Sequence, residues 1–180
     1  TVSCDKNGII SEKLLNYYFS GASNLKSLTI KKGALYDDAL SGWSCLTHIV
    51  LENVTELGDG VFNGCSNLES LIINSDVNDL TDYTYLFNNA GVDSSGIVIT
   101  FGKNVTKVPV NFLNHGGESY NSRRGKFAGI VFEEGSVCAS IGENAFANST
   151  LGSIALPAGV TTIGENAFYN CTNLQSISVD

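Results

Sequence analysis

Residues 141–156 read Ile-Gly-Glu-Asn-Ala-Phe-Ala-Asn-Ser-Thr-Leu-Gly-Ser-Ile-Ala-Leu, and residues 163–179 read Ile-Gly-Glu-Asn-Ala-Phe-Tyr-Asn-Cys-Thr-Asn-Leu-Gln-Ser-Ile-Ser-Val. Both stretches open with the same six residues, Ile141–Phe146 in the first and Ile163–Phe168 in the second. Such identity between neighbouring segments indicates an internal repeat, and a repeat of this length predicts a fold of stacked units.

The same spacing recurs toward the start of the chain. An aromatic residue or a leucine is followed, usually six residues later, by a leucine and then by two apolar residues separated by one position. The clear copies carry the first of these residues at Phe19, Leu40, Phe62, Phe146 and Phe168. Between the two regular groups, Phe87 and Phe112 take this position in two irregular copies.

The two spaced apolar residues of each copy predict a short strand with one buried face, because alternate side chains of a strand point to the same side. Stacking would place seven such strands side by side in one parallel sheet. The Glu-Asn-Ala-Phe segment predicts a turn or short helix on the opposite wall, with its ring in the core. The strand pairs are Leu28/Ile30, Ile49/Leu51, Leu71/Ile73, Ile99/Phe101, Ile130/Phe132, Ile154/Leu156 and Ile177/Val179.

The run Ile163–Phe168, followed by Cys171 and the Asn-Leu-Gln-Ser-Ile of residues 173–177, resembles the BspA-like type of leucine-rich repeat. The resemblance covers most of the chain, although the central copies depart from it and the family's proline after the strand occurs only at Pro157. It implies a secreted or surface-displayed protein, chiefly of host-associated bacteria and some protists, with roles in adhesion and protein binding.

We therefore expect an α/β repeat fold, a leucine-rich-repeat solenoid with a parallel sheet on one face and short helices or turns on the other. A single domain of about seven coils would span residues 1–180, with irregular coils at about 80–140.

The composition argues against two classes of binding partner. The net charge of −8 and the pI of about 4.6 argue against nucleic acid and anionic membrane surfaces, which require clustered lysine and arginine. No apolar stretch approaches the roughly 20 residues that cross a bilayer, so membrane insertion is not expected. Because the chain begins at Thr1, we interpret it as processed or trimmed, with any export signal outside it.

The five cysteines include no Cys-x-x-Cys pair, which fits neither a zinc site nor a compact disulfide framework. Cys65 and Cys171 each lie three residues before the leucine of a repeat, where a small apolar side chain suits a bend. Both are predicted to be buried, unpaired thiols.

The outward positions of the strands form the first candidate site. We hypothesise that a protein or peptide docks there on His48, Val50, Ile72, Thr100 and Val131. The alternative is that β-branched residues simply suit strands. The middle row of outward positions consists of Thr29, Val50, Ile72, Thr100, Val131, Ala155 and Ser178. The neighbouring row consists of Ser27, His48, Ser70, Val98, Gly129, Ser153 and Ser176.

An insertion at residues 114–126 is the second candidate site. It carries Tyr120 together with Arg123 and Arg124, the two arginines of this acidic chain. Binding sites are often loops on a rigid scaffold, so the insertion could hold an acidic or glycan partner. The alternative is a solvated loop with no binding role.

Features of an enzyme are weak. His48 and His115 lie in different coils, away from any recognisable nucleophile motif, and no glycine-rich phosphate loop occurs. The acidic pairs at residues 37–38 and 133–134 lack the alternating ligand spacing of calcium loops. We expect no catalytic residues, no cofactor and no metal.

The sequence thus favours a non-catalytic surface module for adhesion or for binding host or matrix proteins. A carbohydrate-binding module and a structural spacer are the alternatives. The oligomeric state stays open, because the seventh strand lacks a capping unit and either more repeats or a dimer contact could cover it.

Overall fold

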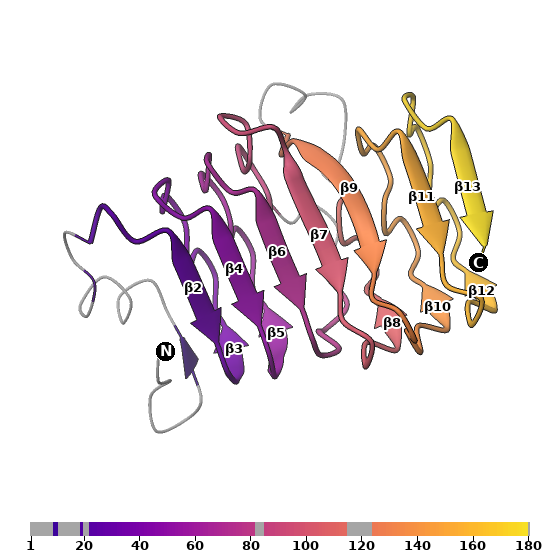
Figure 1. Cartoon of the computed structure of the whole chain (residues 1–180), viewed down its shortest axis with the longest axis horizontal. Coiled ribbons are helices and arrows are strands. Elements are labelled where there is room, and N and C mark those ends of the chain that lie inside the picture. The colour runs from indigo at the N-terminus through magenta and orange to yellow at the C-terminus, as the bar shows by residue number, and fades with distance from the viewer. Residues whose placement is uncertain (1–8, 11–18, 20–21, 82–84, 115–123, 180) are drawn as a thin grey trace.

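The computed structural model describes residues 9–10, 19, 22–81, 85–114 and 124–179 of the 180-residue chain. Strands from successive repeats lie side by side along the long axis (Figure 1). Five of them form one parallel sheet in the order β2-β4-β6-β7-β9, and two form a second sheet, β11-β13. Their bounds are β2 Ser27–Ile30, β4 His48–Leu51, β6 Ser70–Ile73, β7 Ile97–Phe101, β9 Phe127–Phe132, β11 Ser153–Leu156 and β13 Ser176–Val179.

A second set of short strands lies after the first in most repeats. They make two further three-stranded parallel sheets, ordered β1-β3-β5 and β12-β10-β8. Their bounds are β1 Ile9–Ile10, β3 Gly33–Leu35, β5 Val54–Leu57, β8 Lys107–Val108, β10 Ser140–Ile141 and β12 Thr162–Ile163. The chain is therefore a repeat protein built from parallel strands, as the periodicity predicts.

The wall opposite the main sheet consists of turns, and helix is almost absent from the described residues. The option of short helices there is thus not what the structure has. Backbone N–H groups of this wall donate to the next repeat, from Asn144 to Glu165 O at 3.0 Å and from Phe146 to Ala167 O at 2.8 Å. Asn144 also has a positive φ of 52°, which a right-handed helix excludes.

Inward-facing side chains of consecutive repeats fill one continuous core. The rings of Phe62 and Phe87 stack at 5.2 Å, and those of Phe146 and Phe168 lie 5.4 Å apart. The last inward residue of β2, β4, β6, β7 and β11 is fully buried. These residues are Ile30, Leu51, Ile73, Phe101 and Leu156.

The fifth repeat departs from its expected alignment. Leu113 N donates to Ala145 O at 2.7 Å, just as Phe146 N donates to Ala167 O. Leu113 therefore takes the backbone position of Phe146, where the sequence suggested Phe112. Phe112 is still buried and meets the ring of Phe87 at 5.6 Å.

The expected single sheet of seven strands is divided between β9 and β11. No backbone hydrogen bond joins these two neighbours within the described ranges, and β9 is visibly curved (Figure 1). In earlier repeats the residue after the strand donates its N–H to the preceding strand, as Glu133 does to Phe101 O at 3.0 Å. Pro157 occupies this position after β11 and has no N–H to give to Phe132 O.

Candidate functional site

The strand face brings most of the predicted binding residues into one row. In the paired strands Val50 faces Ile72, Ile72 faces Thr100, and Thr100 faces Val131. This confirms the predicted register from β2 to β9, because residues that are paired in parallel strands project to the same side of the sheet. We call the four residues of this row, Val50, Ile72, Thr100 and Val131, the central column.

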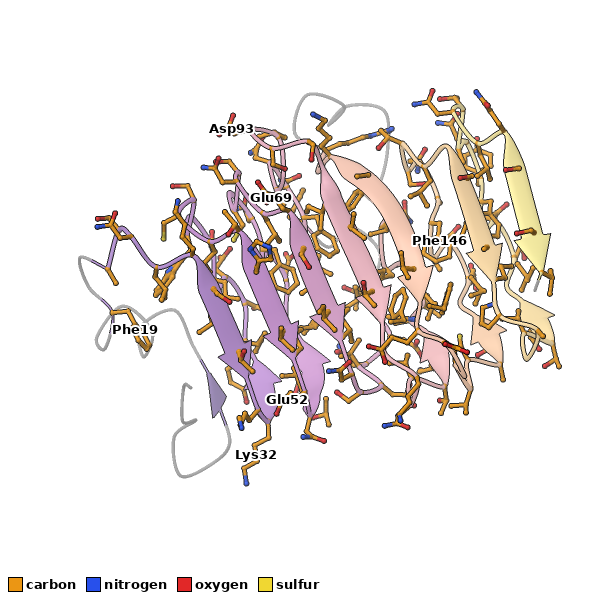
Figure 2. All side chains as sticks on the ribbon, viewed as in Figure 1. Phe19, Lys32, Glu52, Glu69, Asp93 and Phe146 are labelled. Atoms are coloured by element: carbon orange, nitrogen blue, oxygen red, sulfur yellow. The ribbon has the colours of Figure 1, made fainter. Side chains whose placement is uncertain are left out.

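The central column becomes more exposed toward β9. Val50, Ile72 and Thr100 are partly buried, whereas Val131 is 46% exposed. Val131 lies on the last strand of the five-stranded sheet and therefore has a paired neighbour on one side only. The row is uncharged, whereas Glu69 and Asp93 lie at one end of the strands and Glu52 at the other (Figure 2). An uncharged area rimmed by charge is typical of an interaction surface.

His48 lies in the neighbouring row and is exposed. Its Nδ1 is 2.7 Å from Thr47 Oγ1, and that hydroxyl donates to Lys26 O at 3.0 Å. Thr47 Oγ1 and His48 Nδ1 therefore hydrogen-bond to each other, and the tautomer of the ring decides which atom donates.

A cleft of about 570 Å³ lies where the two sheets meet. Val131 and Phe132 line it from β9, and Ala155 and Pro157 line it from β11 and the turn that follows. Phe132 is only partly buried, whereas the equivalent last residues of β2, β4, β6, β7 and β11 are fully buried. The cleft is therefore the place where the core of the stack reaches the strand face.

The mouth of this cleft is acidic. Glu133 and Glu134 are both exposed, and the lining contains no lysine or arginine. Glu133 Oε2 accepts the backbone N–H of Lys103 at 3.0 Å, which holds its carboxylate in place. Sequence reasoning rejected this pair as a calcium site, interpreted it as solvated charge and overlooked the cleft. Pro157 was the available signal.

Of the three residues predicted for the second candidate site, Arg124 is the one that the structure describes. Arg124 Nη1 donates to Asn148 O at 3.0 Å, which ties the end of the insertion to the next repeat. Tyr120 and Arg123 lie outside the described residues. Lys126 ties the same end of the insertion to the preceding repeat, because its backbone N–H donates to Ala90 O at 2.9 Å and its Nζ donates to Ser94 O at 2.8 Å.

The cysteines follow the packing of their repeats. Cys65 is buried, unpaired and 3.2 Å from Leu40 O, as predicted. Burial raises the pKa of its thiol to about 12. Cys171 is also unpaired but only partly buried, so the prediction of burial is wrong there. Its repeat is followed by no further described repeat that could cover it.

Two kinds of feature are absent from the described ranges. They hold no group of three or more histidine, cysteine, aspartate or glutamate side chains placed to bind a metal ion. They also hold no helix with the length and apolarity needed to span a bilayer.

Comparison with known proteins agrees with this architecture. The model of the BspA-type leucine-rich-repeat region matches residues 9–115 and 126–180, in six copies. A crystal structure of a leucine-rich cell surface protein from Faecalibacterium prausnitzii A2-165 is similar, with a TM-score of 0.56 and 19% identity. The similarity covers 99% of this chain but only 45% of that one, and at this identity it concerns the fold. No curated protein matches the chain.

Proposed function

This chain belongs to the BspA-type leucine-rich-repeat family, and from that premise we propose that it is a non-catalytic protein-binding module displayed at a cell surface or secreted. Its stacked repeats would form a solenoid whose strand face contacts the partner. The leucine-rich neighbour of known structure is described as a cell surface protein, which supports this location. Adhesion to host or matrix proteins is the role that we propose for it.

One observation carries the proposal. The central column is an uncharged row on a hydrogen-bonded sheet, with Val131 46% exposed at its end. A rigid row of β-branched side chains can exclude water against a partner without first being ordered, which lowers the entropic cost of association. The same β-branched residues also suit a strand, so the proposal needs a binding test.

Carbohydrate binding has less support. Sugar rings usually pack on exposed aromatic side chains, and the central column contains none. The most exposed described aromatic residues are Tyr36 at 44% and Tyr169 at 63%, and both lie outside the strands of the main face. A glycan array on the intact protein separates this alternative from protein binding.

The experiment compares charge placed on the two faces. The intact protein, the Val50→Glu/Ile72→Glu variant and the Thr55→Glu/Thr162→Glu variant are immobilised and exposed to purified plasma and matrix proteins. The control carries the same added charge on exposed residues of the short strands β5 and β12. We expect the first variant to lose at least tenfold in affinity for a captured protein and the control to keep it. Equal affinity of all three proteins contradicts the proposal, provided that their melting temperatures agree.

A further inference from the structure

The cleft between β9 and β11 differs from every other junction of neighbouring main-face strands in the described structure. Elsewhere these strands are joined by a parallel hydrogen-bond ladder, from β2 to β9 and again from β11 to β13. Here Pro157 has no N–H, so the carbonyl of Phe132 receives no bond at the position where Phe101 receives one from Glu133. The hydrogen-bond ladder is therefore interrupted at this junction, which leaves an opening between β9 and β11.

The opening exposes apolar surface that other repeats hide. Phe132 stacks on the buried Phe101, with ring centroids 5.4 Å apart, and its other side is reached from the cleft. Ala155 is a small residue at the position of β11 that is equivalent to Val131 in β9, so it leaves room beside Val131. The volume of about 570 Å³ falls within the range of roughly 300–1,000 Å³ found for ligand sites.

The negative charge at the mouth of the cleft favours a positively charged occupant. Glu133 and Glu134 are exposed, and the described structure records neither of them in an ion pair. Two carboxylates beside an apolar cleft attract a cation, and the net charge of −8 strengthens that preference at long range. A neutral sugar would gain little from these carboxylates, and an acidic segment would be repelled.

We propose that this cleft binds an extended segment of a partner protein, with an apolar side chain against Phe132 and a neighbouring lysine or arginine beside Glu133 and Glu134. The site deepens the proposed function, on which it rests, because Val131 belongs both to the cleft and to the central column. A peptide fits better than a compact ligand, since a segment lying on the strand face can reach the cleft and its acidic mouth together.

The probe is a phage-displayed library of random dodecapeptides, selected on the intact protein. The enriched peptides are synthesised, and their affinities are measured by fluorescence polarisation against three proteins: the intact chain, Glu133→Gln/Glu134→Gln and Glu56→Gln/Glu165→Gln. The last variant makes the same change of net charge at exposed residues outside the cleft. Amide chemical shifts of the labelled protein locate the bound peptide.

We expect the selected peptides to pair an apolar residue with lysine or arginine. Their affinity should fall at least tenfold in the first variant, stay within twofold in the control, and decrease as ionic strength rises. Shifts should centre on residues 130–136 and 155–159. Overturning results are the absence of enriched peptides, equal loss in both variants, or shifts confined to other residues. Loss of protein capture in Val50→Glu/Ile72→Glu alone, with unchanged capture in Glu133→Gln/Glu134→Gln, would keep the proposed function and reject this site.

Discussion

Phe101 and Phe132 stack with their ring centroids 5.4 Å apart and their planes at 22°, yet Phe101 is fully buried and Phe132 is only partly so. The two residues end adjacent strands of the same sheet and face each other in its register. The difference in burial arises because β6 and β9 flank Phe101 on both sides within the sheet, whereas the strand after Phe132 belongs to another sheet.

Truncating these two rings should therefore have unequal effects. Phe101→Ala removes a fully buried ring and should lower the free energy of unfolding by about 3–5 kcal/mol. Phe132→Ala removes a ring that already contacts the cleft, so its cost should be about half as large. Denaturant unfolding of both variants measures the difference. Equal losses would mean that the Phe132 ring is as well packed as that of Phe101.

Replacing Pro157 tests why the sheet divides. Pro157→Asn supplies a backbone N–H at the position where Glu133 N donates to Phe101 O at 3.0 Å. We expect the new amide to bond to Phe132 O and to exchange with deuterium about as slowly as the amide of Glu133. Fast exchange at position 157 would show that the curvature of β9, and not the proline, keeps the strands apart.

The cysteines should differ sharply in reactivity. Burial raises the pKa of Cys65 to about 12, so its reactive thiolate is scarce near neutral pH. Cys171 is partly buried and more accessible. A short pulse of iodoacetamide on the folded protein, read by peptide mass spectrometry, should label Cys171 well before Cys65. Similar labelling of both residues would contradict the burial of Cys65.

Asp79 should stabilise the protein in a pH-dependent way. The hydrogen bond from Lys107 Nζ at 2.8 Å, and then that from the Val110 N–H, lower the pKa of Asp79. A lowered pKa in the folded state means that the stabilisation is present above the unfolded pKa of about 3.9 and is lost as the pH falls through the folded value.

Asp79→Asn keeps an acceptor for Val110 but removes the charge. Because the pair with Lys107 is largely exposed, the loss should be at most about 1 kcal/mol near neutral pH. Unfolding measured at several pH values should show the two proteins converging below about pH 4. A difference that persists in acid would assign the loss to packing instead of charge.

Asparagine residues whose backbone is in the left-handed region should tolerate replacement by glycine better than replacement by alanine. Asn166 has a φ of 55° and is exposed, so few side-chain contacts complicate the comparison. Asn166→Ala should cost about 1 kcal/mol, because the Cβ of alanine disfavours this conformation, while Asn166→Gly should cost less. Thermal unfolding of the pair measures this. The reverse order would indicate that the turn changes conformation when the asparagine is lost.

Much of the main face could be predicted from spacing alone. The register that aligns Val50, Ile72, Thr100 and Val131 follows from the repeat length, because equivalent residues of stacked units must lie side by side. The opposite wall was harder. The sequence allows either turns or short helices, and the choice depends on whether N–H groups such as that of Asn144 bond within a repeat or to the next one.

By itself the sequence determined the repeat, the parallel strands and the residues that face the core, because periodic apolar positions allow only one set of side chains to be buried. Tertiary structure decided the division of the sheet, the exposure of Phe132 and the acidic cleft beside it. These features depend on whether two strands of different repeats come close enough to bond. Pro157 gives a local hint of that outcome, but the curvature of β9 and the packing around it settle it only in three dimensions.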